Sequence, residues 1–246
     1  MYGVGGDDNY RTYELIGRSE RLFLIETAGL KPTDNFLDVG CGLGRVAAQL
    51  TSYFDPRVKY EGLDIVPAGI DWCNRTISSR YENFQFTLAD VYNREYNPKG
   101  KFMASDYRFP YRDNSFDFVL LISVFTHMTP REMENYVLNV SRVLKKGGKC
   151  LATFFLLNET SKRQIENRMS SLNLEYHLDE VLDPNRVCRT IDPGAPERGL
   201  AYEEQHVLGI LRRSGLNPHG PVRYGVWPET FLPSIHYQDI ILAQKI

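Results

Sequence analysis

Five segments of the chain have the hydrophobic character of strands, and segments with the spacing of amphipathic helices lie between them. The strand-like segments are residues 35–40, 59–65, 83–91, 116–123 and 149–157. The clearest helical segments between them are residues 45–53 and 130–145. Because crossover helices join parallel strands, this alternation predicts an α/β fold with a mainly parallel sheet.

The sequence predicts both ends of the helical segment at residues 130–145. Apolar residues recur every three or four positions from Met133 to Leu144, which is typical of a helix with one buried face. The pattern predicts a helix that begins near Arg131 and ends at the glycine pair 147–148.

The end of the chain predicts a pair of strands. Residues 222–227 and 236–244 have strand character, and a loop with Pro228 and Pro233 joins them. We expect the two strands to lie antiparallel at one side of the sheet.

The length of 246 residues fits one domain with additions better than two domains. We predict a single domain over residues 1–246 with an N-terminal helical segment at 1–33. Two long stretches do not fit the alternation: a loop at 92–114, and an insertion at 172–202 before a helix at 203–214. Loops of this length in a compact domain tend to be functional, so we expect these additions on the substrate side.

Composition narrows the possible partners. Lys and Arg number 29 against 31 Asp and Glu, so the formal charge is −2 and no overall field draws the chain to nucleic acid or anionic lipid. The four cysteines form no C-x-x-C pair and no histidines lie at ligand spacing, which predicts reduced thiols in a cytoplasmic protein and no metal site. A signal-peptide pattern and an apolar run of about 18 residues are both absent, so no membrane insertion is expected.

The segment NFLDVGCGLGRVAAQL is the most informative part of the sequence. Gly40, Gly42 and Gly44 stand between a predicted strand and a predicted helix, and glycine allows positive φ and a close approach of backbone to ligand. Such a turn lies at the carboxyl ends of the strands, where open α/β sheets bind ligands. A dinucleotide loop reads G-x-G-x-x-G, whereas this loop reads G-x-G-x-G after Asp38. The Asp38 carboxylate would repel a pyrophosphate and attract the ammonium of an amino-acid-like ligand.

Two further strands are predicted to end in aspartate. Asp64 ends the next strand, 20 residues after Gly44, where a carboxylate can accept hydrogen bonds from both ribose hydroxyls of an adenosine. Asp90 ends the third strand, where a carboxylate can accept from the exocyclic amine of adenine. With Asp38, three successive strand ends match an amine, a ribose and an adenine in order.

With these features the chain resembles the class I S-adenosylmethionine-dependent methyltransferases from about residue 35 to residue 157. The resemblance rests on DVGCGLG from Asp38, the strand ends at Asp64 and Asp90, FPYRDNSFDFVLL from Phe109, and SRVLKKGGKCLATFF from Ser141. It implies a Rossmann-like, doubly wound sheet of seven strands, mainly parallel, with an antiparallel last strand. The block SVFTHM, with YGVW and YQDI near the end, resembles more narrowly a bacterial group that acts on small molecules.

The resemblance implies S-adenosyl-L-methionine as cofactor and S-adenosyl-L-homocysteine as product. The three glycines would line the methionine part of the cofactor. Asp64 would hold the ribose, Ile65 would pack on adenine, and Asp90 with the Val91 backbone would meet the adenine edge. The predicted cofactor contacts are, in chain order, Asp38, Gly40, Cys41, Gly42, Gly44, Asp64, Ile65, Asp90, Val91 and Ser123.

These assignments have alternatives. Glycine-rich turns also bind other nucleotides, including the nicotinamide cofactor of oxidoreductases, although the spacing here disfavours one. Asp64 could instead cap the helix that follows near Pro67. Asp106 competes with Asp90 because it lies closer to the FPY segment, where related chains often carry their adenine-side acid. We favour Asp90 because it ends a regular alternation of apolar residues from Phe84.

His127, in the segment LLISVFTHMTP, is the predicted catalytic residue. It follows the fourth strand at the same edge as the glycine loop, within reach of the transferred methyl. Methyl transfer from a sulfonium is an in-line displacement, in which the protein aligns the acceptor and excludes water. A hydroxyl acceptor also needs a base for its proton. Alternatively, Thr126 or His127 caps the helix near Pro130, or the imidazole only bonds the backbone.

The acceptor is predicted to be a small molecule. Nucleic-acid amino-methyltransferases of this fold carry an Asn- or Asp-Pro-Pro-aromatic block after the fourth strand, whereas this chain has SVFT at residues 123–126. With the near-neutral charge, this disfavours a base of DNA or RNA. Aromatic residues in the additions could wall a pocket. The predicted substrate contacts are Tyr10, Tyr13, Arg18, Tyr224 and Trp227.

An oxygen acceptor is preferred over nitrogen or carbon. The alternative from another class is a non-catalytic member of the fold that binds the cofactor or a partner. Neither the acceptor's identity nor the oligomeric state follows from the sequence.

Overall fold

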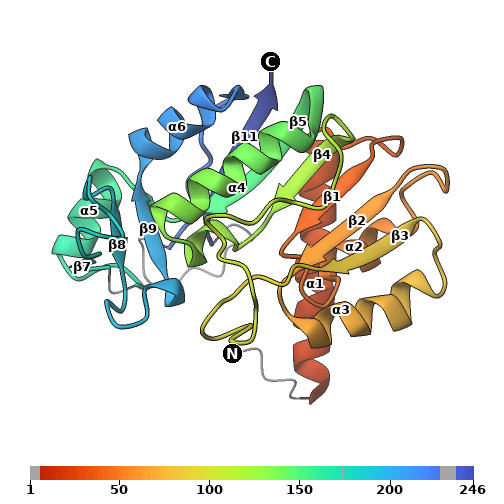
Figure 1. Ribbon diagram of the computed structural model, residues 1–246, viewed down its shortest axis with the longest axis horizontal. Helices are drawn as coiled ribbons and strands as arrows, with labels where there is room; N and C mark the ends of the chain where they lie inside the picture. Colours follow the sequence, from red (N-terminus) through yellow and green to blue (C-terminus); the bar gives the residue numbers. More distant parts are fainter. Residues whose placement is uncertain (1–5, 173, 228–236) are drawn as a thin grey trace.

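The computed structural model describes residues 6–172, 174–227 and 237–246, with side chains from residue 11 onward. Seven strands form one sheet in the order β10-β11-β5-β4-β1-β2-β3 (Figure 1). They are β1 Phe36–Val39, β2 Tyr60–Asp64, β3 Phe84–Leu88, β4 Phe116–Leu121, β5 Leu144–Phe154, β10 Leu216–Pro218 and β11 Asp239–Lys245. Neighbouring strands are parallel except that β11 runs antiparallel to β5 and β10. The expected doubly wound sheet with an antiparallel last strand is confirmed.

Helices cover both faces of this sheet (Figure 1). On one face lie α1 (Gly6–Glu26), α2 (Arg45–Leu50) and α3 (Pro67–Cys73), and on the other lie α4 (Pro130–Val143) and α6 (Glu204–Arg213). Successive residues of β1 divide between them: Phe36 packs with the first layer, and Leu37 with the second. Burial on both faces explains why the strands are nearly continuous apolar runs. No helix in the described ranges is both long and apolar enough to cross a bilayer.

A row of aromatic rings crosses four neighbouring strands on the face under α1 and α2. Phe36 is the register partner of both Tyr60 and Phe118, and Tyr60 is the partner of Phe84. Their rings stack with centroids 5.4 Å apart for Phe36 and Tyr60, 5.5 Å for Phe36 and Phe118, and 4.6 Å for Tyr60 and Phe84. Because a slip of one residue would turn every side chain to the opposite face, this row specifies the register.

The insertion at 172–202 builds most of a second, smaller sheet with the order β6-β9-β8-β7, beside α5 (Glu159–Glu166). Its strands are β6 Leu156–Leu157, β7 Tyr176–His177, β8 Cys188–Thr190 and β9 Leu200–Glu203. Figure 1 shows this unit at the β5 side of the main sheet. It has its own apolar cluster, which includes Phe155, Ile165 and Trp227.

The predicted end of the helix at residues 147–148 is wrong. α4 ends at Val143, and β5 begins at Leu144, whose backbone is extended. The β4–β5 register shifts between Phe116, which pairs with Leu144, and Phe118, which pairs with Lys149. The glycine pair lies within this irregular part of the strand, where Gly147 has a φ of 79° that favours glycine.

The predicted terminal strand pair is partly wrong. In the described residues β11 pairs with β5 and β10, and residues 222–227 contribute only an isolated bridge between Arg223 and Ile240. The Asp239 carboxylate accepts hydrogen bonds from the Gly225 N–H and the Trp227 indole, which hold this segment outside the ladder. The prolines at 228 and 233 and the histidine at 236 lie outside the described residues.

We predict that Phe36→Ala lowers the free energy of unfolding by about 3–5 kcal/mol, because it removes the centre of the aromatic row from a site with 0% exposure. Urea denaturation measures the change. Phe102→Ala is the matched control, because that ring is 52% exposed, and a change within about 0.5 kcal/mol is expected. Equal losses in both variants would contradict the role of the row.

Candidate active site

The turn after β1 has the backbone that its glycines predict. Gly40, Gly42 and Gly44 all have positive φ, at 79°, 55° and 74°. A Cβ on Gly40 would lie 2.5 Å from the Val124 side chain, so this position needs glycine for packing as well as for φ. A Cβ on Gly42 would meet no atom within 4 Å. The turn therefore presents bare backbone to open space at Gly42, where a ligand can approach.

Asp64 ties this turn to the end of β2. Its Oδ2 accepts the Gly42 N–H at 2.7 Å, and its Oδ1 accepts the Val66 N–H at 2.8 Å. The alternative of a helix cap is wrong, because the N-cap of α3 is Val66 and no side chain caps it. Burial raises the pKa of Asp64, and the backbone donors oppose that rise. Each carboxylate oxygen still has a second lone pair for a ligand hydroxyl.

Asp38 lies buried below the turn. Its carboxylate accepts the Tyr60 hydroxyl at 2.5 Å. Burial raises the pKa of Asp38 to about 7, the Tyr60 hydrogen bond opposes this rise, and the charges of Glu20 and Asp64 add to it. A positive group bound at the turn would compensate the desolvated charge, which agrees with the predicted ammonium contact.

Helix α1 packs against the turn. The Tyr13 hydroxyl donates to the Leu43 carbonyl at 3.0 Å, and Arg45 forms a two-pronged ion pair with Glu20 at 2.7 and 2.9 Å. Tyr13 thus lies on the glycine turn itself, although it was predicted as a substrate contact.

For the two other predicted substrate contacts on α1, Arg18 and Tyr10, the structure shows no contact with the glycine turn among the described side chains. Arg18 is exposed and pairs with Glu14 one turn earlier on the same helix. Tyr10 lies in α1, but its side chain is outside the described part of the structure.

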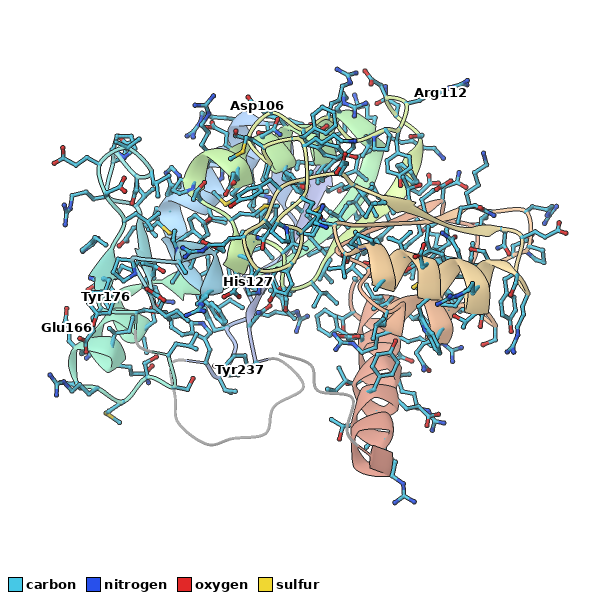
Figure 2. The ribbon with its side chains drawn as sticks, turned by 60° about the horizontal axis from the view of Figure 1, so that its bottom comes forward. Asp106, Arg112, His127, Glu166, Tyr176 and Tyr237 are labelled. Atoms are coloured by element: carbon cyan, nitrogen blue, oxygen red, sulfur yellow. The ribbon has the colours of Figure 1, made fainter. Side chains whose placement is uncertain are left out.

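Asp90 and Asp106, the two candidates for the adenine side, differ in exposure and in their ion pairs. The Asp90 side chain is 35% exposed and lies 3.2 Å from Lys101 just beyond the end of β3. The Asp106 side chain is 68% exposed and pairs only loosely with Arg131, at 3.8 Å. Figure 2 shows Asp106 well away from His127.

The backbone of Val91 is already engaged, which sequence reasoning did not anticipate. Its N–H donates to the Ala89 carbonyl at 2.7 Å, and its C=O accepts the Asn97 side-chain amide at 3.0 Å. A contact from this N–H to adenine would require the turn to rearrange. Ile65 is partly buried against the core and follows Asp64 directly.

Ser123 closes a small polar network at the end of β4. Its φ of 57° is unusual for a residue with a side chain, and such backbone costs about 1–3 kcal/mol. The Ser123 N–H donates to the Thr153 hydroxyl at 2.8 Å, and both hydroxyls donate to the Gln238 side-chain oxygen, at 3.0 and 2.6 Å. Sequence reasoning missed Thr153 and Gln238. A threonine within the apolar run LATFF was the available signal for the first of them.

His127 ends the short 3-10 helix Phe125–His127 after β4. Its Nδ1 lies 2.7 Å from the Glu197 carbonyl oxygen, and its ring packs edge to face with the Tyr96 ring, with centroids 5.9 Å apart. A carbonyl only accepts, so Nδ1 carries the hydrogen and Nε2 is the acceptor of the neutral ring. No hydrogen-bond partner for Nε2 is found among the described residues. Figure 2 shows His127 near the centre of the view.

The capping alternative for this segment is wrong. The N-cap of α4 is Thr129, and the Glu132 carboxylate accepts both its N–H and its hydroxyl at 2.8 Å. The backbone contact of the imidazole, the other alternative, is the one observed. That contact also fixes which ring nitrogen can accept a proton.

Trp227 is a core residue and not a substrate contact. It is 0% exposed, its indole donates to Asp239 at 2.7 Å, and its ring packs on Phe155. Tyr224 is exposed, and its hydroxyl donates to the Glu204 carboxylate at 3.0 Å. It lines a cavity of about 490 Å³ beside the second sheet, among Asn158, Lys162, Glu203 and neighbouring residues.

The cysteines are buried and unpaired with one another. All four are free thiols, and burial raises the pKa of Cys73 and Cys150 to about 12. Cys41 lies in the glycine turn, and burial also raises the pKa of its thiol. Within the described ranges, no three His, Cys, Asp or Glu residues are grouped to hold a metal ion.

A family model described as a methyltransferase domain matches residues 37–152. This segment belongs to the methyltransferase domain family, and the sheet has the fold of solved S-adenosylmethionine-dependent methyltransferases. The matched segment of this methyltransferase runs from β1 into β5 and includes the turn, both aspartates and His127. The cofactor of the family is S-adenosyl-L-methionine.

Three similar proteins show how far the likeness extends. A sterol 24-C-methyltransferase of Gibberella zeae is 31% identical over 136 residues, which cover 54% of this chain and 30% of that protein. The structure of a protein from Pyrococcus horikoshii has a TM-score of 0.60 and 19% identity, and covers 98% of this chain and 100% of that chain. Geranyl diphosphate C-methyltransferase from Streptomyces coelicolor, solved with S-adenosyl-L-homocysteine, has a TM-score of 0.59 and 13% identity, and covers 100% and 86%.

The comparisons support different conclusions about fold and about function. The two solved structures share the fold of this methyltransferase over nearly its whole length. The match to the sterol methyltransferase spans only about a third of that protein's length. The acceptor of this methyltransferase is therefore a matter for proposal.

We predict that Asp38→Asn stabilises the ligand-free protein above pH 7 and weakens binding of S-adenosyl-L-homocysteine. The folded state binds the Asp38 proton more tightly than the unfolded state, so the wild type loses stability as the pH rises from about 4 to about 7. The variant lacks this loss, and its Tm at pH 8 should exceed that of the wild type by about 3 °C or more. Calorimetry at pH 8 should show at least about tenfold weaker binding.

The comparison at pH 4 is the internal control, because the wild-type carboxyl is then protonated and the difference in Tm should nearly vanish. A difference in Tm that is independent of pH would contradict the buried, ionising carboxyl.

Proposed function

We propose that this chain transfers the methyl group of S-adenosyl-L-methionine to a small-molecule acceptor, with His127 as the base that takes the acceptor's proton. The observation that carries the proposal is the contact of Nδ1 of His127 with the Glu197 carbonyl at 2.7 Å, which leaves Nε2 as the acceptor. This imidazole follows β4, and the glycine turn follows β1, the strand beside it in the sheet. A base at that place can serve a group held next to the cofactor.

The residues of the turn fit this cofactor. Open space at Gly42 accommodates the methionine part, the buried Asp38 offers a charge for its ammonium, and Asp64 has lone pairs for the ribose. Asp90 stands at the next strand end for adenine. When bound, the cofactor supplies an electrophilic methyl group on a sulfonium.

His127 would act on the acceptor. A hydroxyl becomes a good nucleophile when a base removes its proton, and Nε2 is the nitrogen able to take it. The Tyr96 ring and the residues around Glu197 cover one side of the imidazole, so they would help to exclude water from it. This arrangement supports a hydroxyl oxygen as the acceptor, because a carboxylate or a neutral amine can attack without first losing a proton.

A carbon acceptor is the second candidate. Two of the similar proteins are named as C-methyltransferases, one for sterols and one for geranyl diphosphate. Reaction with a methyl donor labelled with ¹³C distinguishes the two, because the chemical shift of the product methyl separates a methoxy group from a C-methyl group. A cytoplasmic location and the absence of nucleic-acid partners remain predictions from composition.

We predict that S-adenosyl-L-homocysteine binds the purified protein and that Asp64→Ala weakens this binding at least about tenfold, because hydrogen bonds to a charged group are lost. Isothermal titration calorimetry measures both affinities. Asp71→Asn is the control, because Asp71 is exposed on α3, and its affinity should equal that of the wild type. No binding by the wild type would contradict the cofactor assignment, and binding of a nicotinamide dinucleotide instead would favour an oxidoreductase.

We predict that His127→Ala lowers turnover about 10²-fold or more with little change in cofactor affinity, the scale of a positioned base. The assay follows label from the cofactor into a product that mass spectrometry first identifies in a small-molecule extract. His219→Ala is the matched control, since His219 is exposed near the start of the β10–β11 connection. Unchanged turnover in His127→Ala would show that the residue is structural. A wild type that binds cofactor but transfers no label would favour the non-catalytic alternative.

A further inference from the structure

The loop at 92–114 and the insertion at 172–202 meet at His127. From the first, the ring of Tyr96 contacts the imidazole edge to face, with an interplanar angle of 80°. From the second, the carbonyl of Glu197 contacts Nδ1. The two contacting residues, Tyr96 and Glu197, are 31 and 70 positions from His127 in the chain, so their meeting there is a tertiary feature.

Two arginines hold the additions together. The Nε of Arg198 donates to the Glu95 carboxylate at 2.6 Å, and an Nη of Arg94 donates to the Gly194 carbonyl at 2.8 Å. Arg198 also reaches Asp192, within its own segment, at 3.2 Å. Each addition therefore supplies one arginine that contacts the other addition.

Arg198 is the residue directly after Glu197, whose carbonyl contacts His127. Both lie in the 3-10 helix Pro196–Arg198, so the ion pair of Arg198 with Glu95 is one residue away from the oxygen that contacts His127. Backbone geometry couples neighbouring residues closely, because only two torsions per residue are free. An anchor on Arg198 thus restrains the position of the Glu197 carbonyl.

The position of that oxygen decides the chemistry of the ring. A neutral imidazole carries one hydrogen, and the hydrogen bond at one nitrogen determines which one bears it. With the Glu197 carbonyl at 2.7 Å, the hydrogen is on Nδ1, and the lone pair is on Nε2. If the carbonyl moved away, the two forms of the ring would interconvert, and part of the population would carry hydrogen on Nε2 and lose its function as a base.

We propose that Arg198, acting through Glu95, is a positioning residue that keeps the Glu197 carbonyl against Nδ1 of His127 and so reserves Nε2 as the proton acceptor. The effect on turnover rests on the proposed function, whereas the effect on the imidazole does not. Arg94 supports the same arrangement through Gly194.

These contacts can be removed without unfolding the protein. The side chains of Arg198 and Glu95 are 53% and 33% exposed, and ion pairs of this kind add little to stability. Variants at these positions should therefore fold, and any change at His127 reports position instead of stability.

The first experiment measures the hydrogen position directly in the full chain without cofactor or acceptor. Long-range ¹H–¹⁵N correlation spectra of ¹⁵N-labelled histidines report which imidazole nitrogen is protonated, and the spectrum of His127→Ala assigns the signal among the five histidines. The wild type should show His127 with hydrogen on Nδ1. The double variant Arg94→Ala with Arg198→Ala should show a mixture of both forms.

Arg112→Ala is the matched control for loss of a surface arginine. Arg112 is exposed, and Figure 2 shows it at the upper right edge of the molecule, away from His127. Its spectrum should equal that of the wild type. An unchanged His127 form in the Arg94 and Arg198 double variant would overturn the proposal, as would a wild type with hydrogen on Nε2.

The second experiment tests the path through Glu95. Arg198→Ala and Glu95→Ala should each lower turnover about fivefold, the factor that corresponds to a loss of about 1 kcal/mol in a positioning contact. If the two residues act as a pair, the double variant should lose no more than either single variant. Losses that multiply would overturn the pairwise path. A shifted imidazole with unchanged turnover would instead overturn the base role of His127 and leave the positioning intact.

Discussion

The stacking of four aromatic rings across β3, β2, β1 and β4 is the constraint on which the site depends. Parallel strands that share a register also end at a common level, so Gly40, Asp64 and His127 meet at one edge only while that register holds. The aromatic row also contacts the candidate site directly. The hydroxyl of Tyr60, one of its members, donates a hydrogen bond to the Asp38 carboxylate. Packing in the core and the charge below the turn are thus parts of one arrangement.

Most of the main sheet could be predicted because its determinants are local. Apolar runs of strand length, each followed by a helix or a glycine turn, need no knowledge of the partners. The errors arose where tertiary pairing decides. The glycine pair at 147–148 has the local chemistry of a helix stop, yet pairing of Leu144 with Phe116 converts the segment to strand. The segment before Trp227 has strand character, yet the buried Asp239 carboxylate holds it in place instead.

The residues of the candidate site also fall into a locally encoded group and a group that tertiary contacts bring together. The turn with Asp38 and Asp64 is encoded within some 27 residues, so its residue types and spacing predict its geometry. Thr153, Gln238 and Glu197 come from elsewhere in the chain, and Glu197 is 70 positions from His127. Thr153 contributes its hydroxyl, Gln238 its side-chain amide and Glu197 its backbone carbonyl. Because these groups are common along any chain, the residue types did not mark them as parts of the site. The role of Trp227 was missed for a related reason, since aromatic residues in loops cover core as readily as ligands.

The unequal burial of the two tryptophans gives the molecule two separate optical reporters. Trp72 is 49% exposed on α3, next to Cys73, whose thiol contacts the glycine turn, whereas Trp227 is 0% exposed in the cluster of the small sheet. An aqueous quencher such as iodide reaches only the first, and the emission of the second reports a dry environment. Intrinsic fluorescence can therefore follow the turn side and the added sheet independently in one unlabelled sample, and separate their unfolding if they do not melt together.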